Sequence, residues 1–372
     1  MFLTKIIHEF DFQNAIFTLL AKPYFHLGKG SNTLWNFIRH FGGILRTFWF
    51  LRLKSNFDYC KHFNYLHLMI RTTFFLVITL SALVAAVSSA NITLTLNQES
   101  AFNTVLWIVF GVAMACFIIG EITNNNSQVD KLWSLIPIAY VWHFTFYADF
   151  EPRLVLMAAL VTAWGLRLTY NFSRRGGYNL LPWKGEEDYR WSVLRAKPEF
   201  QGRGRWMLFN LFFICLYQNA LIFLFTLPIL EAWRGNDAPL GWLDYTATAL
   251  FLGFLTMETI ADQQQYDYQT EKYRRKNSGE SLGEFYGKGF THTGLWAKMR
   301  HPNYAAEQAI WLSFYLFSVA ATGEWLNWSI SGAILLLFLF RGSSNFSEDI
   351  STSKYPQYTD YKKTTPRFIP WF

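Results

Sequence analysis

The feature that most constrains this chain is a series of long apolar runs, each close to the thickness of a lipid bilayer. A helix needs about 20 residues to cross the hydrocarbon core of a membrane. Because no water reaches that core, a crossing segment must satisfy its own backbone hydrogen bonds, which favours helices. The runs that we interpret as transmembrane helices cover residues 67–90, 101–122, 132–150, 154–172, 206–232, 242–261, 304–321 and 325–340.

The alternative is a soluble helical protein whose long helices are buried. Such helices would carry polar residues on one face at the helical period, and these runs have no polar face. Only 16% of the residues are charged, whereas a typical soluble domain has about 25%. We therefore predict an all-α, polytopic membrane protein with about eight transmembrane helices, of which the runs near Leu132 and Leu154 are the shortest.

The basic residues predict the orientation in the membrane. Lys and Arg outnumber Asp and Glu by 33 to 26, and the excess lies in the loops after the fourth and sixth runs. The connections on the other side contain one basic residue, Arg234. By the positive-inside rule, the basic loops and both termini face the cytoplasm, or the matrix if the membrane is mitochondrial. We expect an intracellular membrane, the endoplasmic reticulum, with the mitochondrial inner membrane as the alternative.

The chain divides into three regions by composition. Residues 1–66 are basic and amphipathic, and residues 34–53 within them favour an interfacial helix on the membrane surface. Residues 67–123 contain the first two predicted spans and show no family resemblance, whereas residues 124–372 carry the motifs described below.

A polar cluster stands where the seventh run begins, in the stretch Lys298-Met299-Arg300-His301-Pro302-Asn303-Tyr304. Pro302 suits the first turn of a helix, so we expect the helix to begin near His301. The free N–H groups at that end, together with Arg300 and His301, would suit a phosphate. Glu307 follows inside the apolar helix, where a carboxylate is costly and usually faces a partner or a wet cavity. The alternative is that Arg300 and Lys298 reach lipid phosphates and that Glu307 pairs with one of them, but the whole cluster favours a ligand site.

Other charged groups fall on the same side of the predicted membrane. Glu258 and Asp262 lie one helical turn apart, on one face, at the end of the sixth run. Arg167 is a charge inside the fourth run. Each group alone could cap a helix or contact lipid headgroups, but their gathering on one side indicates a site.

Six strings of this sequence carry a family resemblance: VDKLWSLIP, WGLRL, EEDYRW, ETIADQQQ, TGLWAKMRHPNYAAEQAIW and YPQYTDYKKTTPRFIPW. Together they resemble the steroid 5-alpha-reductase-like family of uncharacterised membrane proteins, of the DUF1295 type. The resemblance covers about residues 124–372, and its superfamily also contains isoprenylcysteine carboxyl methyltransferases. The ADQQQ and EDYRW strings are similar to the reductase-like branch.

The resemblance implies an enzyme that uses NADPH to reduce a carbon–carbon double bond conjugated to a carbonyl, in a lipid-like or steroid-like substrate. The cofactor would bind on the cytoplasmic or matrix face, with the tail residues Tyr358 and Tyr361 closing over it. The residues implied in cofactor binding are Arg167, Asp188, Arg190, Asp262, Gln263, Arg300, His301, Asn303, Tyr304, Glu307 and Tyr358.

Reduction of an enone also needs an acid near the carbonyl to offset the growing enolate charge. Glu121, Tyr140 and His143 are the candidates in the more N-terminal spans, although no motif assigns them. His143 could equally be a buried histidine that bonds to a neighbouring helix.

Two other functions stay open at this point. One is a non-catalytic subunit of a larger membrane assembly, mitochondrial for example, since the N-terminal third lies outside the resemblance. The other is an S-adenosylmethionine-dependent lipid methyltransferase that uses the same His-Pro site. We expect membrane lipids and a lipid-like small molecule as partners, and no nucleic acid. We expect no metal, because Cys60, Cys116 and Cys215 are too widely spaced to form a ligand set.

Overall fold

The computed structural model describes residues 93–179, 181, 185–235 and 239–370. All of them lie in one compact unit. Every regular element in these described ranges is a helix, which confirms the all-α class. The predicted surface helix at residues 34–53, the first predicted span and the boundary at residue 66 lie outside the described residues.

Four helical segments are long and apolar enough to cross a membrane, within the part of the chain that the structure describes. They make the chain a membrane protein, although the predicted count of eight spans stays a prediction. The segments are α5 (Leu96–Thr123), α8 (Pro152–Ser173), the continuous stretch Arg203–Arg234, and the stretch Trp328–Lys354.

The third of these segments changes its helical geometry along its length. It begins as α10 (Arg203–Phe209) and continues as α11 (Gln218–Thr226) and α12 (Pro228–Arg234). Between α10 and α11 lies η5 (Asn210–Tyr217), a π-helix of 8 residues. Such wide turns are rare and often occur at functional sites.

The run at residues 132–150 forms a shorter helix than the sequence predicts. The chain turns after α6 (Gln128–Leu132), and α7 (Ile136–Tyr147) has 12 residues. At 1.5 Å per residue α7 is about 18 Å long, so by itself it does not cross a core of about 30 Å.

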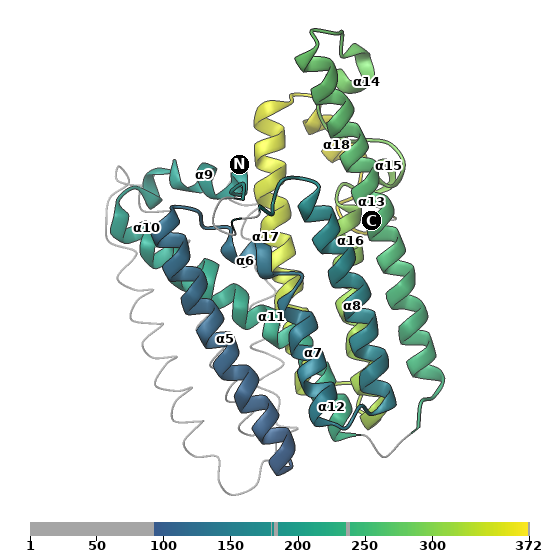
Figure 1. Cartoon of the computed structure of the whole chain (residues 1–372). Coiled ribbons are helices and arrows are strands. Elements are labelled where there is room, and N and C mark those ends of the chain that lie inside the picture. Colours follow the sequence, from purple (N-terminus) through teal and green to yellow (C-terminus); the bar gives the residue numbers. More distant parts are fainter. Residues whose placement is uncertain (1–92, 180, 182–184, 236–238, 371–372) are drawn as a thin grey trace, which may run out of the picture. The chain divides into compact units, whose positions relative to one another are not determined.

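Two helices that pack against each other carry most of the polar motifs. α13 (Trp242–Asn277) has 36 residues and extends well beyond the predicted span at 242–261. α16 (Pro302–Thr322) lies beside it, and α8 also packs against both (Figure 1). α17 (Ser331–Lys354) packs against α11 and α16. The short elements are α9 (Tyr189–Arg195), η4 (Pro198–Phe200), α14 (Gly283–Gly287), α15 (Leu295–Lys298), η6 (Trp328–Ile330) and α18 (Tyr358–Thr364).

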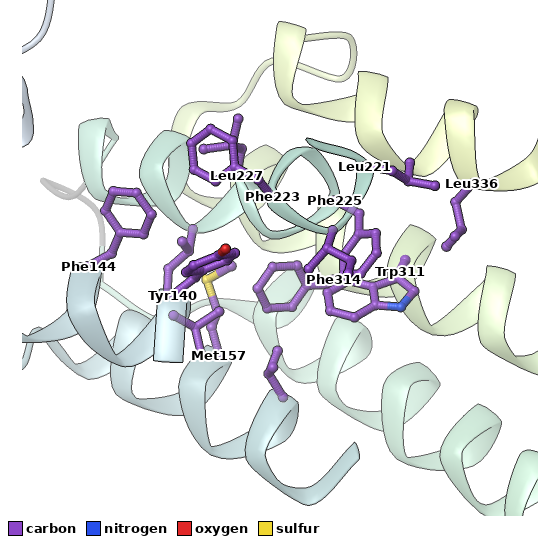
Figure 2. Close-up of a cluster of buried hydrophobic side chains, with 14 of the residues drawn as sticks. Tyr140, Phe144, Met157, Leu221, Phe223, Phe225, Leu227, Trp311, Phe314 and Leu336 are labelled. Carbon is purple, nitrogen blue, oxygen red and sulfur yellow. The ribbon is translucent and has the colours of Figure 1, made fainter. Parts of the chain in front are cut away.

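The core is built largely from aromatic side chains. Trp311 of α16 packs on Phe225 of α11, with 4.0 Å between ring centroids. Figure 2 shows this cluster, to which α7 and α8 contribute Tyr140 and Met157. Large rings bury much apolar area per residue, so they fix how these helices approach one another.

A buried ion pair fixes α8 against α13 at the end remote from the basic loops. Arg153 Nε lies 2.8 Å from Asp244 Oδ1, and both side chains are 1% exposed. Arg153 also donates to the carbonyl of Pro239. Because the pair sits at the start of both helices, it fixes their register, and the polar residues further along then face one another.

Candidate functional site

The start of α16 agrees with the sequence prediction. Pro302 is the first residue of the helix and His301 is its N-cap. His301 makes no side-chain capping bond, so its ring is available for other contacts. The ring stacks on Tyr304 with 5.3 Å between centroids and an interplanar angle of 13°.

Asp262 of α13 collects donors from two other helices. Arg167 Nη1 and Asn171 Nδ2 of α8 donate to its Oδ2 across 2.7 and 2.8 Å. Asn303 Nδ2 of α16 donates to its Oδ1 across 3.1 Å. The Asp262 side chain thus joins α8, α13 and α16 at one buried point.

Arg167 also forms an ion pair with Glu258, one turn before Asp262. The expected alignment of Glu258 and Asp262 on one helical face is therefore confirmed. Arg167 Nε is buried and has no hydrogen-bond partner among the described residues. A buried donor without a partner is costly, so this atom is a candidate contact for an acceptor on a ligand.

Glu307 lies one helical turn after Asn303 on α16, and each of its carboxylate oxygens accepts a hydrogen bond from an indole. Trp164 Nε1 donates to Oε2 across 2.7 Å, and Trp311 Nε1 donates to Oε1 across 3.0 Å. The two indole rings meet edge to face, 4.9 Å apart. Glu307 was predicted to contact the cofactor, and its position favours a role in holding α8 and α16 together beneath the Asp262 group.

A second charged group forms between the loop before α9 and the start of α6. Arg190 Nε pairs with Asp188 Oδ1 across 2.8 Å, and Asp130 lies 4.0 Å from the same guanidinium. Trp191 Nε1 donates to Asp130 Oδ2 across 2.9 Å. Burial would raise the pKa of Asp188, but the charge and hydrogen bonds of Arg190 outweigh burial, so its pKa is lowered.

Tyr304 connects the two charged groups. Its hydroxyl lies in the electrostatic field of Arg190, Asp188 and Asp262. Its ring also packs against Phe340 of α17, 4.7 Å between centroids. The predicted residues Arg167, Asp188, Arg190, Asp262, Asn303 and Tyr304 therefore lie in one neighbourhood, although they come from four separate parts of the sequence.

Two further arginines border this neighbourhood. Arg174 donates to Gln263 Oε1 across 2.6 Å, and its guanidinium lies 4.1 Å from the centre of the Tyr266 ring. Arg175 is exposed and acts on Asp188 and Tyr304 through its charge. Its side chain forms no hydrogen bond or ion pair with the described residues, so Arg175 offers an uncommitted positive charge.

Arg300 and His301 contact α17 and the C-terminal tail, and the His301 ring also stacks on Tyr304. Arg300 Nε donates to Glu348 Oε1 across 2.8 Å, and its Nη1 donates to the carbonyls of Lys362 and Thr365. His301 Nε2 lies 3.0 Å from the same Glu348 oxygen. Burial lowers the pKa of His301, against the opposing effect of Glu348. Their predicted role with phosphates is untested, but their observed contacts are with the chain itself.

The tail crosses the segment before α16, whereas its closure over a cofactor stays a prediction. The Tyr361 hydroxyl donates to the carbonyl of Trp296, and Tyr358 packs edge to face on Phe290 at 4.9 Å. The amide of Arg300 donates to the carbonyl of Pro366 across 2.9 Å.

The three candidates for the acid occupy different places. Glu121 accepts from Asn210 across 2.8 Å, and Tyr140 is buried in the core. His143 Nε2 lies 3.2 Å from the Ala101 carbonyl, which fits the alternative of a histidine bonded to a neighbouring helix. Within the described ranges, no hydrogen bond or ion pair joins these three side chains.

Sequence reasoning missed Asn171 and Glu348. Asn171 carried a usable signal, because it lies one turn after Arg167 on the same helical face. Glu348 carried none, because its partners Arg300 and Arg367 are distant in sequence and its neighbours are ordinary polar residues.

Comparison with known proteins gives two matches. The profile of the family described as "Protein of unknown function (DUF1295)" matches residues 116–365. An uncharacterized protein of Schizosaccharomyces pombe is 39% identical over 290 residues, which cover 72% of this chain and 81% of the relative. No solved structure matches.

Proposed function

The chain belongs to the DUF1295 family, a steroid 5-alpha-reductase-like family of membrane proteins, and on that premise we propose that it is an NADPH-dependent reductase. The proposed reaction is reduction of a carbon–carbon double bond conjugated to a carbonyl in a lipid-like or steroid-like molecule. The cofactor would bind at the basic end of the helices, on the cytoplasmic or matrix side, in an intracellular membrane such as the endoplasmic reticulum.

The observation that carries the proposal is the convergence at Asp262. Arg167, Asn171 and Asn303 reach this one carboxylate from α8 and α16. Small or apolar residues would make a purely structural contact between membrane helices at a lower free-energy cost than buried charged groups. Buried polar groups of this kind near one another are typical of binding sites.

The donor set at this end fits a dinucleotide phosphate. NADPH carries several negative charges and an amide, so it needs cations at its phosphates and hydrogen-bond donors at its amide. Arg175 forms no ion pair with any of the described residues. Arg167 Nε is a buried donor that has no acceptor among them. Arg190 and Arg174 supply further guanidinium groups nearby.

In this proposal the protein binds and orients, and the cofactor supplies the hydride. Asn303 and Arg167 would hold the amide end, and Arg175 and Arg190 would hold phosphates. Asp262 would keep the Arg167 and Asn303 side chains in position. The acid that serves the carbonyl is proposed to be one of Glu121, Tyr140 and His143.

The test is a titration of the detergent-purified full chain with NADPH, followed by quenching of tryptophan fluorescence. Micromolar binding is expected, with an affinity that falls as salt is added because phosphate contacts are ionic. Arg175→Ala should weaken binding by about tenfold, since it removes one charge contact worth about 1.4 kcal/mol.

Arg203→Ala is the matched control, because Arg203 is also an exposed arginine and lies at the start of α10. Its affinity for NADPH should equal that of the wild type. Tight binding of S-adenosylmethionine with no binding of NADPH would favour the methyltransferase instead. Binding of neither ligand would leave the non-catalytic subunit as the better description.

A further inference from the structure

Two polar atoms in the apolar core have no hydrogen-bond partner within the part of the chain that the structure describes. They are the hydroxyl of Tyr140 on α7 and Oδ1 of Asn219 on α11. The residues are 1% and 0% exposed, so water does not reach them from the surface. Buried polar atoms are almost always paired, and an exception calls for an explanation such as a binding role.

The two side chains lie on helices that pack against each other, and both adjoin Phe223. Phe223 of α11 lies one helical turn after Asn219, and its ring meets the ring of Tyr140 on α7. Around them the core is apolar: Tyr140 meets Phe223 edge to face at 6.0 Å and lies near Met157 (Figure 2). Two polar groups, from α7 and α11, thus form an isolated polar spot among rings and aliphatic chains.

The backbone fixes which end of the Asn219 amide is free. Asn219 Nδ2 donates to the carbonyl of Cys215 across 2.8 Å. A flipped amide would set two oxygens against each other, so the nitrogen must face the carbonyl and Oδ1 must be the free atom. Cys215 belongs to the π-helix η5, and its carbonyl also accepts from the Gln218 amide; such wide turns recur at functional sites.

The polar spot therefore offers one donor and one acceptor to a ligand. The Tyr140 hydroxyl can donate, and Asn219 Oδ1 can only accept. A hydroxyl group satisfies both, because its oxygen accepts while its hydrogen donates. An aldehyde or ketone satisfies Tyr140 and leaves Asn219 unpaired, whereas a hydrocarbon leaves both unpaired.

We propose that Tyr140 and Asn219 form the polar end of a ligand site in the helix core that recognises the hydroxyl group of a lipid-like molecule. This inference rests on the proposed reductase and deepens it, because it gives the substrate a hydroxyl group in addition to its conjugated carbonyl. Tyr140 then serves recognition of the hydroxyl, and the acid for the carbonyl is left to Glu121 or His143.

The experiment uses the full chain in lipid nanodiscs without NADPH and three probes of equal chain length: hexadecanol, hexadecanal and hexadecane. Binding is measured as the rise in the thermal midpoint with probe concentration. Hexadecanol should bind about tenfold more tightly than hexadecanal, because only the alcohol pairs Asn219 Oδ1. Hexadecane should bind more weakly than both.

Tyr140→Phe removes one hydroxyl and should reduce the preference for hexadecanol over hexadecane by about tenfold. Tyr147→Phe, on the same helix and partly buried, is the matched control and should keep the wild-type order. Equal binding of hexadecanol and hexadecane by the wild type would overturn the proposal without any variant. An unchanged preference in a folded Tyr140→Phe protein would overturn it as well. Neither outcome depends on NADPH, so the reductase proposal is tested separately.

Discussion

Arg300 and Glu348 form a buried ion pair that joins the segment before α16 to α17. Nε of Arg300 lies 2.8 Å from Oε1 of Glu348, and the side chains are 9% and 1% exposed. Arg367 pairs with the other Glu348 oxygen across 3.1 Å. One carboxylate therefore anchors both the motif that precedes α16 and the C-terminal tail that crosses it.

Arg300→Ala should destabilise the protein by about 3 kcal/mol, because it removes one partner of a buried pair and leaves two tail carbonyls without a donor. We expect a lower thermal midpoint in detergent and faster proteolytic cleavage of the tail. Lys363→Ala is the control, since its pair with Asp360 is exposed and contributes little. Equal stability of the Arg300 variant and the wild type would contradict the anchoring role.

Asp262→Asn should destabilise the helix contact by about 2 to 4 kcal/mol. The change removes the negative charge that faces Arg167 and replaces one acceptor oxygen with a donor, which opposes the donors of Asn171 or Asn303. Thermal unfolding of the purified variant measures the loss. Asp267→Asn, one turn further along α13 and exposed, should stay within about 0.5 kcal/mol of the wild type.

Lys272 should make stability depend on pH in the alkaline range. Its ammonium donates to the Gly289 carbonyl across 2.9 Å. Burial, and then the charges of Lys354 and Lys276, lower its pKa from 10.5 to about 8. Between these two pKa values the unfolded chain binds more protons than the folded chain, so stability should rise from pH 8 toward pH 10.5.

The contribution of Lys272 is the difference between the pH profiles of the wild type and Lys272→Met, measured by thermal unfolding. We expect the wild type to gain about 1 to 3 kcal/mol relative to that variant across this window. Lys363→Met removes an exposed lysine of α18 and should keep the wild-type profile. A wild-type profile that falls relative to Lys272→Met would contradict the lowered pKa.

Gly289→Ala should destabilise the loop between α14 and α15 by about 1 to 3 kcal/mol. Gly289 has φ of +82°, and a Cβ atom there would collide with the ring of Tyr355. Gly287→Ala is the matched control, because a Cβ at Gly287 would meet open space. Chemical or thermal unfolding of both variants distinguishes a strained position from a general intolerance of the loop.

The sequence alone determined the helix class and several local positions. Long apolar runs leave a chain no other way to satisfy its backbone in a membrane, so the all-α fold followed from hydropathy. Pro302 marked the start of α16 because its ring fits only the first turn. The helical period was enough to place Glu258 and Asp262 on one face, where both now meet Arg167.

Tertiary structure decided which partner each charge has. Arg300 looked like a phosphate ligand, but its carboxylate partner, Glu348, is 48 positions further along the chain. Likewise, both oxygens of Glu307 are taken by Trp164 and Trp311, of which Trp164 lies 143 positions earlier. Periodicity reports only neighbours within a few residues, whereas a charge is satisfied by whatever the packing of distant helices brings within about 3 Å. The residues that bear charge were therefore readable from the sequence, and the contacts that occupy them were set by the fold.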